Sequence, residues 1–249
     1  MAIKNNNPSL IELRVTESTN NYAMAMIHEG LAQDGLAILA YEQTGGKGQW
    51  GKNWQSPAGE SLSLSIILQP AFLKPQQDFQ LLATIAVSVV KILEKYIGKE
   101  SSVKWPNDLY WRDRKAGGIL IETVIKSNAY AWVVAGIGIN VKQSSFPSFL
   151  ENPVSLKQIT GKEVDIKQLA LEIKDQVLTA IEHLKKNGFN EFFNSYNEKL
   201  FSKNKIQKFK KDNRVFATLV QGVNRHGQLV TGSNGENCFS FGEVEWKID

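Results

Sequence analysis

The glycine-rich stretch QTGGKGQWGKNW, residues 43–54, constrains the fold more than any other part of this sequence. Its glycines fit two phosphate-binding patterns, G-x-G-x-x-G and G-x-x-x-x-G-K, and both patterns require a helix to begin directly after the loop. Here Pro57 and Gly59 follow, and SLSLSIIL at 61–68 then alternates as a β-strand does. No acid lies near position 71, and Asn53 replaces the hydroxyl residue that would bind Mg²⁺. The sequence therefore excludes the dinucleotide-binding and P-loop folds and predicts a long loop between two strands.

A loop of this composition is suited to holding a ligand. Its glycines leave backbone amides open to close approach, and Lys47 and Lys52 carry charges that would neutralise a phosphate. Trp54 offers a flat ring on which another ring can stack. The alternative, a mobile hairpin connection in which the lysines are incidental, stays open at this point.

Apolar spacing predicts alternating strands and helices through residue 201. The predicted strands cover 10–15, 36–42, 61–68, 118–125 and 130–141. The predicted helices cover 77–96, 166–186 and 189–201, and another begins at a cap on Ser18 or Thr19 and runs toward Glu29. From 214 to 248 short strand-like runs are broken by turn signals, which predicts a small all-β module. The boundary falls between Lys203 and Lys211, and we divide the chain into domains 1–205 and 206–249.

Composition narrows the class of protein. Hydrophobic residues make up 42% and charged residues 22% of the 249 residues, as in ordinary globular proteins. The longest apolar stretch, 129–139, is too short to cross a bilayer, and the N-terminus lacks the apolar segment of a secretion signal. Cys238 is the single cysteine, which excludes an intramolecular disulfide and any site built from several cysteines. These features predict a cytoplasmic protein that does not enter a membrane.

Basic residues are concentrated just before the β module. Residues 199–214 carry seven lysines and arginines against one aspartate, a local charge of +6, so the rest of the chain carries 4 − 6 = −2. We interpret this stretch as a solvated connector. The alternative is a patch that attracts an acidic partner or nucleic acid.

A second cluster of polar residues lies in KWPNDLYWRDRKAGGILIE, residues 104–122. Pro106 stops any helix, and Asn107 and Asp108 are turn formers that present oxygen atoms. Lys115 follows seven residues after Asp108, directly before small residues that let a substrate lie against the next strand. An ammonium there suits a reaction in which negative charge builds on phosphate or carbonyl oxygen. The alternative is a hairpin whose exposed turn is DRK.

Two shorter motifs point the same way. In GIGIN, residues 136–140, alternate glycines in a buried strand indicate close approach of a ligand or of a crossing helix, and Asn140 offers an amide able to read an adenine edge. In ESTN, residues 17–20, the first function is a helix cap, which is compatible with ligand binding at the same helix terminus.

Taken together, in order and spacing, these motifs resemble the biotin–protein ligases. KWPND, the gap to Lys115, AGGIL and GIGINV match that family, and FSFGEVEW near the C-terminus matches its last domain more loosely. The resemblance implies an α+β fold: a central mixed β-sheet packed by helices, plus a small C-terminal barrel of the Src-homology-3 type. It also implies a two-step ligation, in which biotin and MgATP give biotinyl-5′-AMP and a lysine of a carboxylase's biotin-carrier domain then accepts the biotin.

The same resemblance assigns roles residue by residue. Lys115 is implied to lie between the biotin carboxylate and the α-phosphate as the catalytic residue, and Asp108 to orient Lys115 or Mg²⁺. Positions assigned to biotin are Ser18, Thr19, Asn20, Gln43, Gly46, Lys47, Gly48, Gln49, Gly117 and Gly118. Positions assigned to ATP and the adenylate are Lys47, Lys52, Trp54, Asn107, Lys115 and Asn140.

This chain departs from the family in its glycine-rich loop. Many members read G-R-G-R-x-G-R, whereas Lys47, Gln49 and Lys52 stand in place of the arginines here. Lysine keeps the charge but loses the bidentate fork, and Gln49 loses the charge. We therefore expect faster leakage of biotinyl-AMP than with arginines. With about nine residues before the first strand, we also expect no winged-helix module and no DNA binding.

Two alternative functions remain. A lipoate–protein ligase or octanoyltransferase would share the fold but would need a pocket for a linear chain, whereas Ser18, Thr19 and Gln43 suit a ureido ring. A non-enzymatic biotin sensor or nucleic-acid binder would not require Lys115 and the whole loop. Whether two copies pair through sheet edges into a homodimer is left open by the sequence.

Overall fold

The computed structural model describes residues 10–51, 53–55 and 57–247. Its larger part is a seven-stranded sheet with the order β1-β2-β3-β7-β6-β5-β4. The strands are β1 (Leu10–Leu13), β2 (Ala37–Ala40), β3 (Ser61–Leu68), β4 (Ser101–Lys104), β5 (Asp108–Trp111), β6 (Arg114–Lys126) and β7 (Ala129–Asn140). Only β1 and β2 pair in parallel among these, so the sheet is mixed, as the family resemblance implied.

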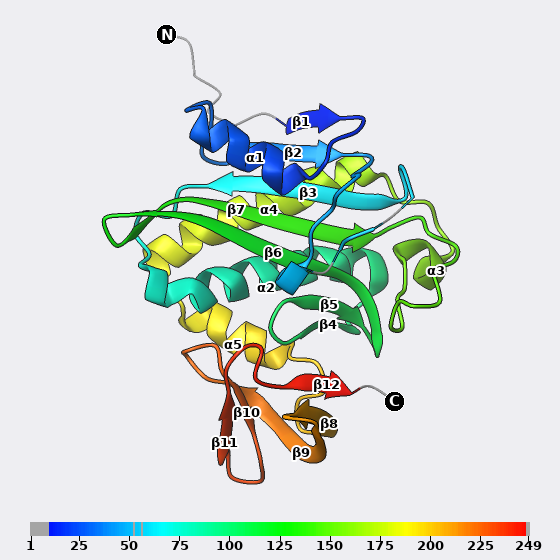
Figure 1. The fold of residues 1–249 in the computed structure, drawn as a ribbon, viewed down its shortest axis with the longest axis vertical. Coiled ribbons are helices and arrows are strands. Elements are labelled where there is room, and N and C mark those ends of the chain that lie inside the picture. Colours follow the sequence, from blue (N-terminus) through cyan, green and yellow to red (C-terminus); the bar gives the residue numbers. More distant parts are fainter. Residues whose placement is uncertain (1–9, 52, 56, 248–249) are drawn as a thin grey trace.

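Helices cover both faces of this sheet (Figure 1). The helices are α1 (Thr19–His28), α2 (Asp78–Ile97), α3 (Leu156–Thr160), α4 (Ile166–Asn187) and α5 (Asn190–Glu198), with short 3-10 turns η1 (Gln49–Gly51) and η2 (Pro75–Gln77). Helices α2 and α4 pack on each other and on the face formed by Leu62, Leu64 and Ile66. Helix α1 packs on the opposite face, against Ile38, Ile67 and Val134. Alternation along each strand assigns neighbouring residues to these two layers.

The helix boundaries follow from local sequence. Ser18 has an extended backbone and its Oγ accepts from the Asn21 amide, which begins α1 as predicted. Asp165 caps α4 through the amides of Lys167 and Gln168. Gly98 and Gly188, both with positive φ, end α2 and α4, because glycine adopts that backbone conformation without strain. No helix among the described residues is long and apolar enough to cross a membrane.

The C-terminal module is an antiparallel five-stranded sheet with the order β11-β10-β9-β8-β12. Its strands are β8 (Ile206–Lys211), β9 (Arg214–Val223), β10 (Leu229–Thr231), β11 (Asn237–Phe239) and β12 (Glu245–Lys247). The all-β prediction is confirmed, but the barrel is not closed: β11 and β12 form two open edges in the described part of the module. The small sheet lies at the end of the molecule opposite β1 (Figure 1).

The predicted basic connector is not a connector, because β8 lies within it. Phe209 is buried while Lys208 and its cross-strand neighbour Lys247 lie on the other face, so one apolar residue anchors a strand of mostly polar composition. The prediction also missed β4, β5 and α3. Phe209 and Trp246 belong to the same hydrophobic cluster as α2 and β3, so the core is continuous across the module. The division at 205/206 therefore stays a prediction.

Candidate active site

The α1 face of the sheet carries a floor of glycines bordered by small serine side chains. Gly118 on β6 pairs with Gly138 on β7, and Gly138 pairs in turn with Ser63 on β3. Two residues before Gly138 on β7, Gly136 pairs with Ser65. The sequence SLSLS and the alternate glycines of GIGIN thus meet on one face, while the intervening isoleucines and leucines fill the core on the other. A floor of this kind leaves room for a flat ligand against the backbone.

The two glycines of β7 accommodate different groups. A Cβ at Gly136 would overlap the side-chain amide of Asn20, and a Cβ at Gly138 would lie 2.7 Å from the Trp54 ring. At Gly136 the structure supports the interpretation of GIGIN as a site for a crossing helix, because α1 approaches there, and a loop aromatic lies over Gly138. Approach of a ligand stays a prediction. The Trp54 Nε1 atom is buried and has no hydrogen-bond partner among the described residues. Leaving an indole N–H unpaired costs about 1–3 kcal/mol.

Lys115 and Asp108 lie beside this floor. Lys115 Nζ is 2.6 Å from Asp108 Oδ1, and both side chains are partly exposed, at 35% and 26%. Asp108 pairs with Gly118, whereas Lys115 pairs with Tyr110, because the register shifts between Leu109 and Tyr110. This β-bulge turns the lysine onto the same face as the aspartate. A Cβ at Gly118 would lie 3.3 Å from Asp108 Oδ1 and 4.0 Å from Lys115 Nζ, so the ion pair borders Gly118.

The ion pair and Trp54 therefore flank one strip of backbone. Lys115 borders Gly118, Trp54 covers Gly138, and these two glycines are directly paired across β6 and β7. Paired residues in an antiparallel ladder lie about 4.5–5.5 Å apart at their Cα atoms. The ammonium and the indole thus lie at neighbouring positions of the same site, and the lysine does not point into open solvent away from it. The alternative of DRK as an exposed turn is wrong: the turn is formed by Arg112, at positive φ, and Asp113, whereas Arg114 and Lys115 already belong to β6.

The backbone of Lys115 is bonded to the segment 152–154 through both its amide and its carbonyl. Its amide donates to Asn152 O at 2.9 Å, and its carbonyl accepts from Val154 N at 2.9 Å. Asn140 Nδ2 donates to Val154 O at 3.2 Å and to Lys115 O at 3.4 Å. Asn107 Nδ2 donates to Ile119 O at 2.6 Å. The side chains of Asn107 and Asn140, both predicted to bind the adenylate, thus bond to carbonyls of the protein itself. Their contact with a nucleotide stays a prediction.

A buried polar network lies at the other end of the floor, at the N-terminus of α1. Thr19 donates from its amide and hydroxyl to Gln43 Oε1, at 2.8 and 3.1 Å. The Ser65 hydroxyl lies 2.8 Å from Thr19 Oγ1 and 2.6 Å from Asn20 Oδ1. Asn20 Nδ2 donates to Glu122 Oε2 at 2.7 Å. The predicted biotin residues Ser18, Thr19, Asn20 and Gln43 are thus brought together with two residues that sequence reasoning missed.

Ser65 and Glu122 could have been found from the alternation of their strands. Ser65 is part of SLSLS, and Glu122 lies four residues beyond Gly118, on the same face of β6. Their roles became visible only with the cross-strand register.

The glycine-rich loop is attached to α1 through side chains. Lys47 Nζ donates to Asn21 Oδ1 at 2.6 Å, and Asn21 Nδ2 donates to Glu17 Oε2 at 3.1 Å. Gly46 is buried, and its carbonyl accepts from Trp54 N at 2.9 Å. A Cβ at Gly46 would lie 2.8 Å from Gln43 Nε2, so this glycine is required for close approach. Gly48 precedes η1, which begins at Gln49.

Two of the predicted positions are not placed at the floor by the structure. Lys52 lies outside the described residues. Gly117 lies on the opposite face of the sheet from the floor, since a Cβ there would be 3.3 Å from the Ile139 side chain. Among the described residues no group of three or more His, Cys, Asp or Glu side chains could hold a metal ion.

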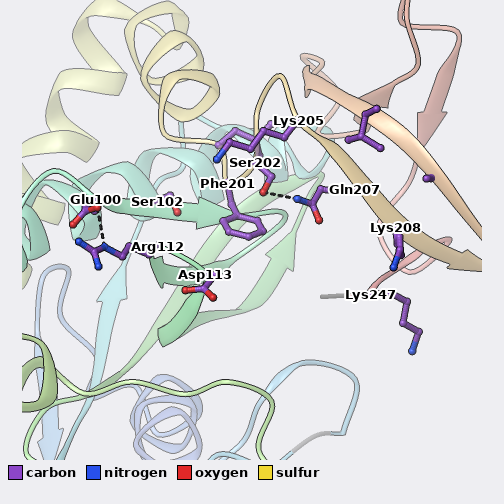
Figure 2. A pocket seen from close by; sticks show the side chains of 13 residues that line it. Glu100, Ser102, Arg112, Asp113, Phe201, Ser202, Lys205, Gln207, Lys208 and Lys247 are labelled. Carbon is purple, nitrogen blue, oxygen red and sulfur yellow. Dashed lines mark hydrogen bonds and ion pairs between the residues drawn. The ribbon is translucent and has the colours of Figure 1, made fainter. Parts of the chain in front are cut away.

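Two large cavities lie away from the glycine floor. One, of about 720 Å³, lies between the β4–β5 hairpin and the C-terminal sheet, and its lining includes Arg112, Asp113, Lys205 and Lys247 (Figure 2). The other, of about 630 Å³, lies near Tyr41 and Lys142. Neither is lined by Lys115 or Trp54. The chemistry of the residues, and not cavity size, identifies the candidate site.

Comparison with solved structures defines the class of protein. The fold matches a biotin protein ligase from Aquifex aeolicus in complex with biotin and ATP, with a TM-score of 0.81, 26% identity and coverage of 97% of this chain and 99% of that one. The mixed sheet with a small β module is therefore the architecture of ligases of this type.

Sequence comparison then identifies the family. Residues 12–140, more than half of the chain, match the biotin/lipoate A/B protein ligase family. The bifunctional ligase/repressor BirA of Escherichia coli is 30% identical over 231 residues, covering 91% of this chain and 70% of the relative. The biotin–[acetyl-CoA-carboxylase] ligase of Mycobacterium tuberculosis is 32% identical over 132 residues, covering 52% and 48%. This chain belongs to the biotin/lipoate A/B protein ligase family.

Proposed function

We propose that this protein activates biotin with MgATP to biotinyl-5′-AMP and transfers the biotin to a lysine of a carboxylase's biotin-carrier domain. The observation that carries the proposal is the Lys115–Asp108 pair, 2.6 Å apart, beside a glycine floor that Trp54 covers. The relatives named as biotin ligases support the choice of substrate. A cytoplasmic location, where ATP and carboxylases are available, is part of the proposal.

In the first step a biotin carboxylate oxygen attacks the α-phosphorus of ATP. A new O–P bond forms, the P–O bond to the β-phosphate breaks, and pyrophosphate leaves. Negative charge builds on the α-phosphate oxygens, and the ammonium of Lys115 is suited to stabilise it. Asp108 keeps that ammonium aimed at the strip between Gly118 and Gly138.

In the second step the neutral amine of the carrier lysine attacks the acyl carbon of the adenylate. A C–N bond forms, the bond from the acyl carbon to the phosphate oxygen breaks, and AMP leaves while the amine loses a proton. Before transfer the anhydride must be protected from water. We propose that the loop at 43–54 provides that cover, and its attachment to α1 through Lys47 and Asn21 supports this role.

The polar network at α1 supports biotin over a linear acyl chain. A ureido ring presents one carbonyl oxygen and two N–H groups, so it needs both donors and acceptors in a compact arrangement. Thr19, Asn20, Gln43 and Ser65 supply hydroxyl and amide groups of both kinds. A lipoyl chain offers this network no matching donors and acceptors, so it would gain no hydrogen bonds from these groups.

Mg²⁺ would neutralise the triphosphate when bound. Magnesium is usually held by one or two carboxylates together with substrate phosphates. Asp108 is the carboxylate placed beside Lys115, and it would serve this role alongside the phosphates of ATP. Asp108 therefore fits a magnesium ion that enters the site together with ATP.

Biotin-dependent exchange of labelled pyrophosphate into ATP tests the proposal. We expect exchange with biotin and none with lipoate. Exchange with lipoate alone would identify a lipoate ligase. Binding of biotin without exchange would identify a non-enzymatic sensor.

A further inference from the structure

Two tryptophans connect the C-terminal module to the segment that leads into Asp108. Trp105, between β4 and β5, donates from Nε1 to Gly227 O at 2.8 Å, in the turn between β9 and β10. In return Trp246 on β12 donates from Nε1 to Trp105 O at 3.2 Å. Tyr196 on α5 donates to the next carbonyl, Pro106 O, at 2.7 Å. Two side chains thus bind the carbonyls of two consecutive residues, and the Trp105 indole anchors the same segment to the module.

These contacts are buried and tightly packed. Trp105, Trp246 and Tyr196 are all buried, and burial raises the pKa of the Tyr196 hydroxyl well above its usual value, so it remains a donor. The Trp246 ring packs on Phe209 at 4.7 Å between centroids, and Trp105 meets Phe241 edge-on at 5.9 Å. Gly227 has φ +80°, and a Cβ there would be 2.8 Å from the Phe79 ring. The turn that receives the Trp105 indole is therefore held against α2.

From Trp105 the chain reaches the ion pair in three residues. Asn107, the next but one, donates to Ile119 O from its side chain and accepts from Ile119 N at 3.1 Å through its carbonyl. Asp108 follows and binds Lys115 at 2.6 Å. The module thus contacts one end of a four-residue segment whose other end carries the carboxylate that aims the lysine.

We propose that Trp246 and Trp105 are positioning residues for the reaction: through reciprocal indole-to-backbone hydrogen bonds, the C-terminal module fixes the segment that presents Asp108 to Lys115. This inference rests on the proposed function. The C-terminal module thereby takes part in adenylation. Loss of a single N–H group on β12 is predicted to slow the chemical step.

Trp246→Phe removes the donor but keeps an aromatic ring against Phe209. Misplacement of a catalytic group by about 1 Å can cost about 10²-fold in rate, and we expect a roughly ten- to hundred-fold lower kcat for pyrophosphate exchange. The KM for biotin should stay within about two-fold, because the biotin network at α1 is not connected to this segment. Trp105→Phe, which removes only the donation to Gly227, should lower kcat in the same direction.

Trp111→Phe is the matched control. Trp111 Nε1 donates to a backbone carbonyl, Ile97 O, at 3.2 Å, at the end of β5 remote from Asp108, so the substitution removes the same kind of bond but not one that holds residues 105–108. It should leave kcat within about two-fold at a similar loss of melting temperature. Equal kcat losses in Trp246→Phe and Trp111→Phe would show that the effect is general destabilisation and would overturn the proposal.

A double-mutant cycle identifies the route. If Trp246 acts through Asp108, Trp246→Phe should cost little further activity in an Asp108→Asn background. If the two sites were independent, their free-energy effects would add and their losses of rate would multiply. Multiplicative losses in the double variant would overturn the positioning role.

Hydrogen exchange separates failure of this inference from failure of the proposed function. The Ile119 amide, bonded to Asn107 O, should exchange faster in Trp246→Phe than in Trp111→Phe, with or without substrates. Unchanged exchange would contradict the inference even in an active ligase. Absence of biotin-dependent pyrophosphate exchange in the wild-type protein would contradict the proposed function. Faster hydrogen exchange at the Ile119 amide in Trp246→Phe would still support the contact between the C-terminal module and residues 105–108.

Discussion

The β5–β6 hairpin and the glycine-rich loop contribute to the same site but are held in different ways. Lys115 is fixed by ladder pairing, by backbone bonds to Asn152 and Val154, and by an ion pair. The loop at 43–54 begins with backbone bonds, from Thr44 N to Thr16 O and from Gly45 N to Glu17 O. Beyond Gly46 it is held by Lys47 on Asn21 and by the Trp54 ring over Gly138. Backbone ladders define position closely, whereas exposed side-chain bonds open at low free-energy cost. The hairpin therefore suits chemistry that needs fixed geometry, and the loop suits a cover that must open.

The largest effect should come from the rigid region. Lys115→Ala should lower the rate of adenylation by about 10²–10³ or more, because it removes the charge that stabilises the transition state. Stability should change by less than about 1 kcal/mol, since the ion pair is partly exposed. Single-turnover formation of the adenylate and a thermal melt measure the two effects.

Lys157→Ala is the control for that experiment, because Lys157 forms an ion pair of equal length, 2.6 Å, with Glu163 outside the proposed site. Its activity should match wild type. A Lys115→Ala variant that retained most of its activity would remove the basis for the proposed mechanism.

The glycine floor links the two regions, and its two glycines should respond differently. Gly138→Ala should weaken ATP binding by roughly 5- to 100-fold, because overpacking of about 1–3 kcal/mol displaces Trp54. Gly136→Ala should instead weaken biotin, since its Cβ meets Asn20. Calorimetry with each ligand measures this. Trp54→Ala should also weaken ATP binding more than biotin binding. Equal weakening of both ligands in these variants would contradict the assignment of Gly138 and Trp54 to ATP and of Gly136 to biotin.

A smaller effect is expected from restoring charge to the loop. Gln49→Arg should slow release of biotinyl-AMP several-fold, since arginine offers a bidentate fork to the phosphate that glutamine lacks. Gln55→Arg, at an exposed position just past the loop, is the control for added charge. Trapping of released adenylate in single turnovers measures the rate, and identical release from both variants would argue against a role for position 49.

The smallest effect concerns the attachment of the loop. Asn21→Ala removes the acceptor for Lys47, a bond worth about 0.5–1.5 kcal/mol, and should speed adenylate release by about 2- to 10-fold. The rate of adenylation should change less, because Lys115 does not depend on this contact. Slower release from Asn21→Ala would indicate that the bond holds the loop open and not closed.

Much of the fold could be predicted from local pattern. The cap at Ser18, the strand at Ser61–Leu68 and the long helix at Asp78–Ile97 follow from spacing and capping that neighbouring residues determine. Strand β8 could not be predicted in this way, because a single buried Phe209 among lysines leaves almost no alternating signal. The open edges of the C-terminal sheet likewise depend on strand pairing and not on any one strand.

The sequence by itself determined which residue types are available for the chemistry: glycines that permit close approach, a lysine before them, and polar groups at a helix terminus. The tertiary structure alone decided that Gly118 lies beside Gly138, that a bulge turns Lys115 toward Asp108, and that Glu122 completes the network at Asn20. The physical reason is that side-chain direction in a sheet depends on cross-strand register, and a shift of one residue reverses the face. Local sequence does not encode that register, since it is selected by packing between segments far apart in the chain.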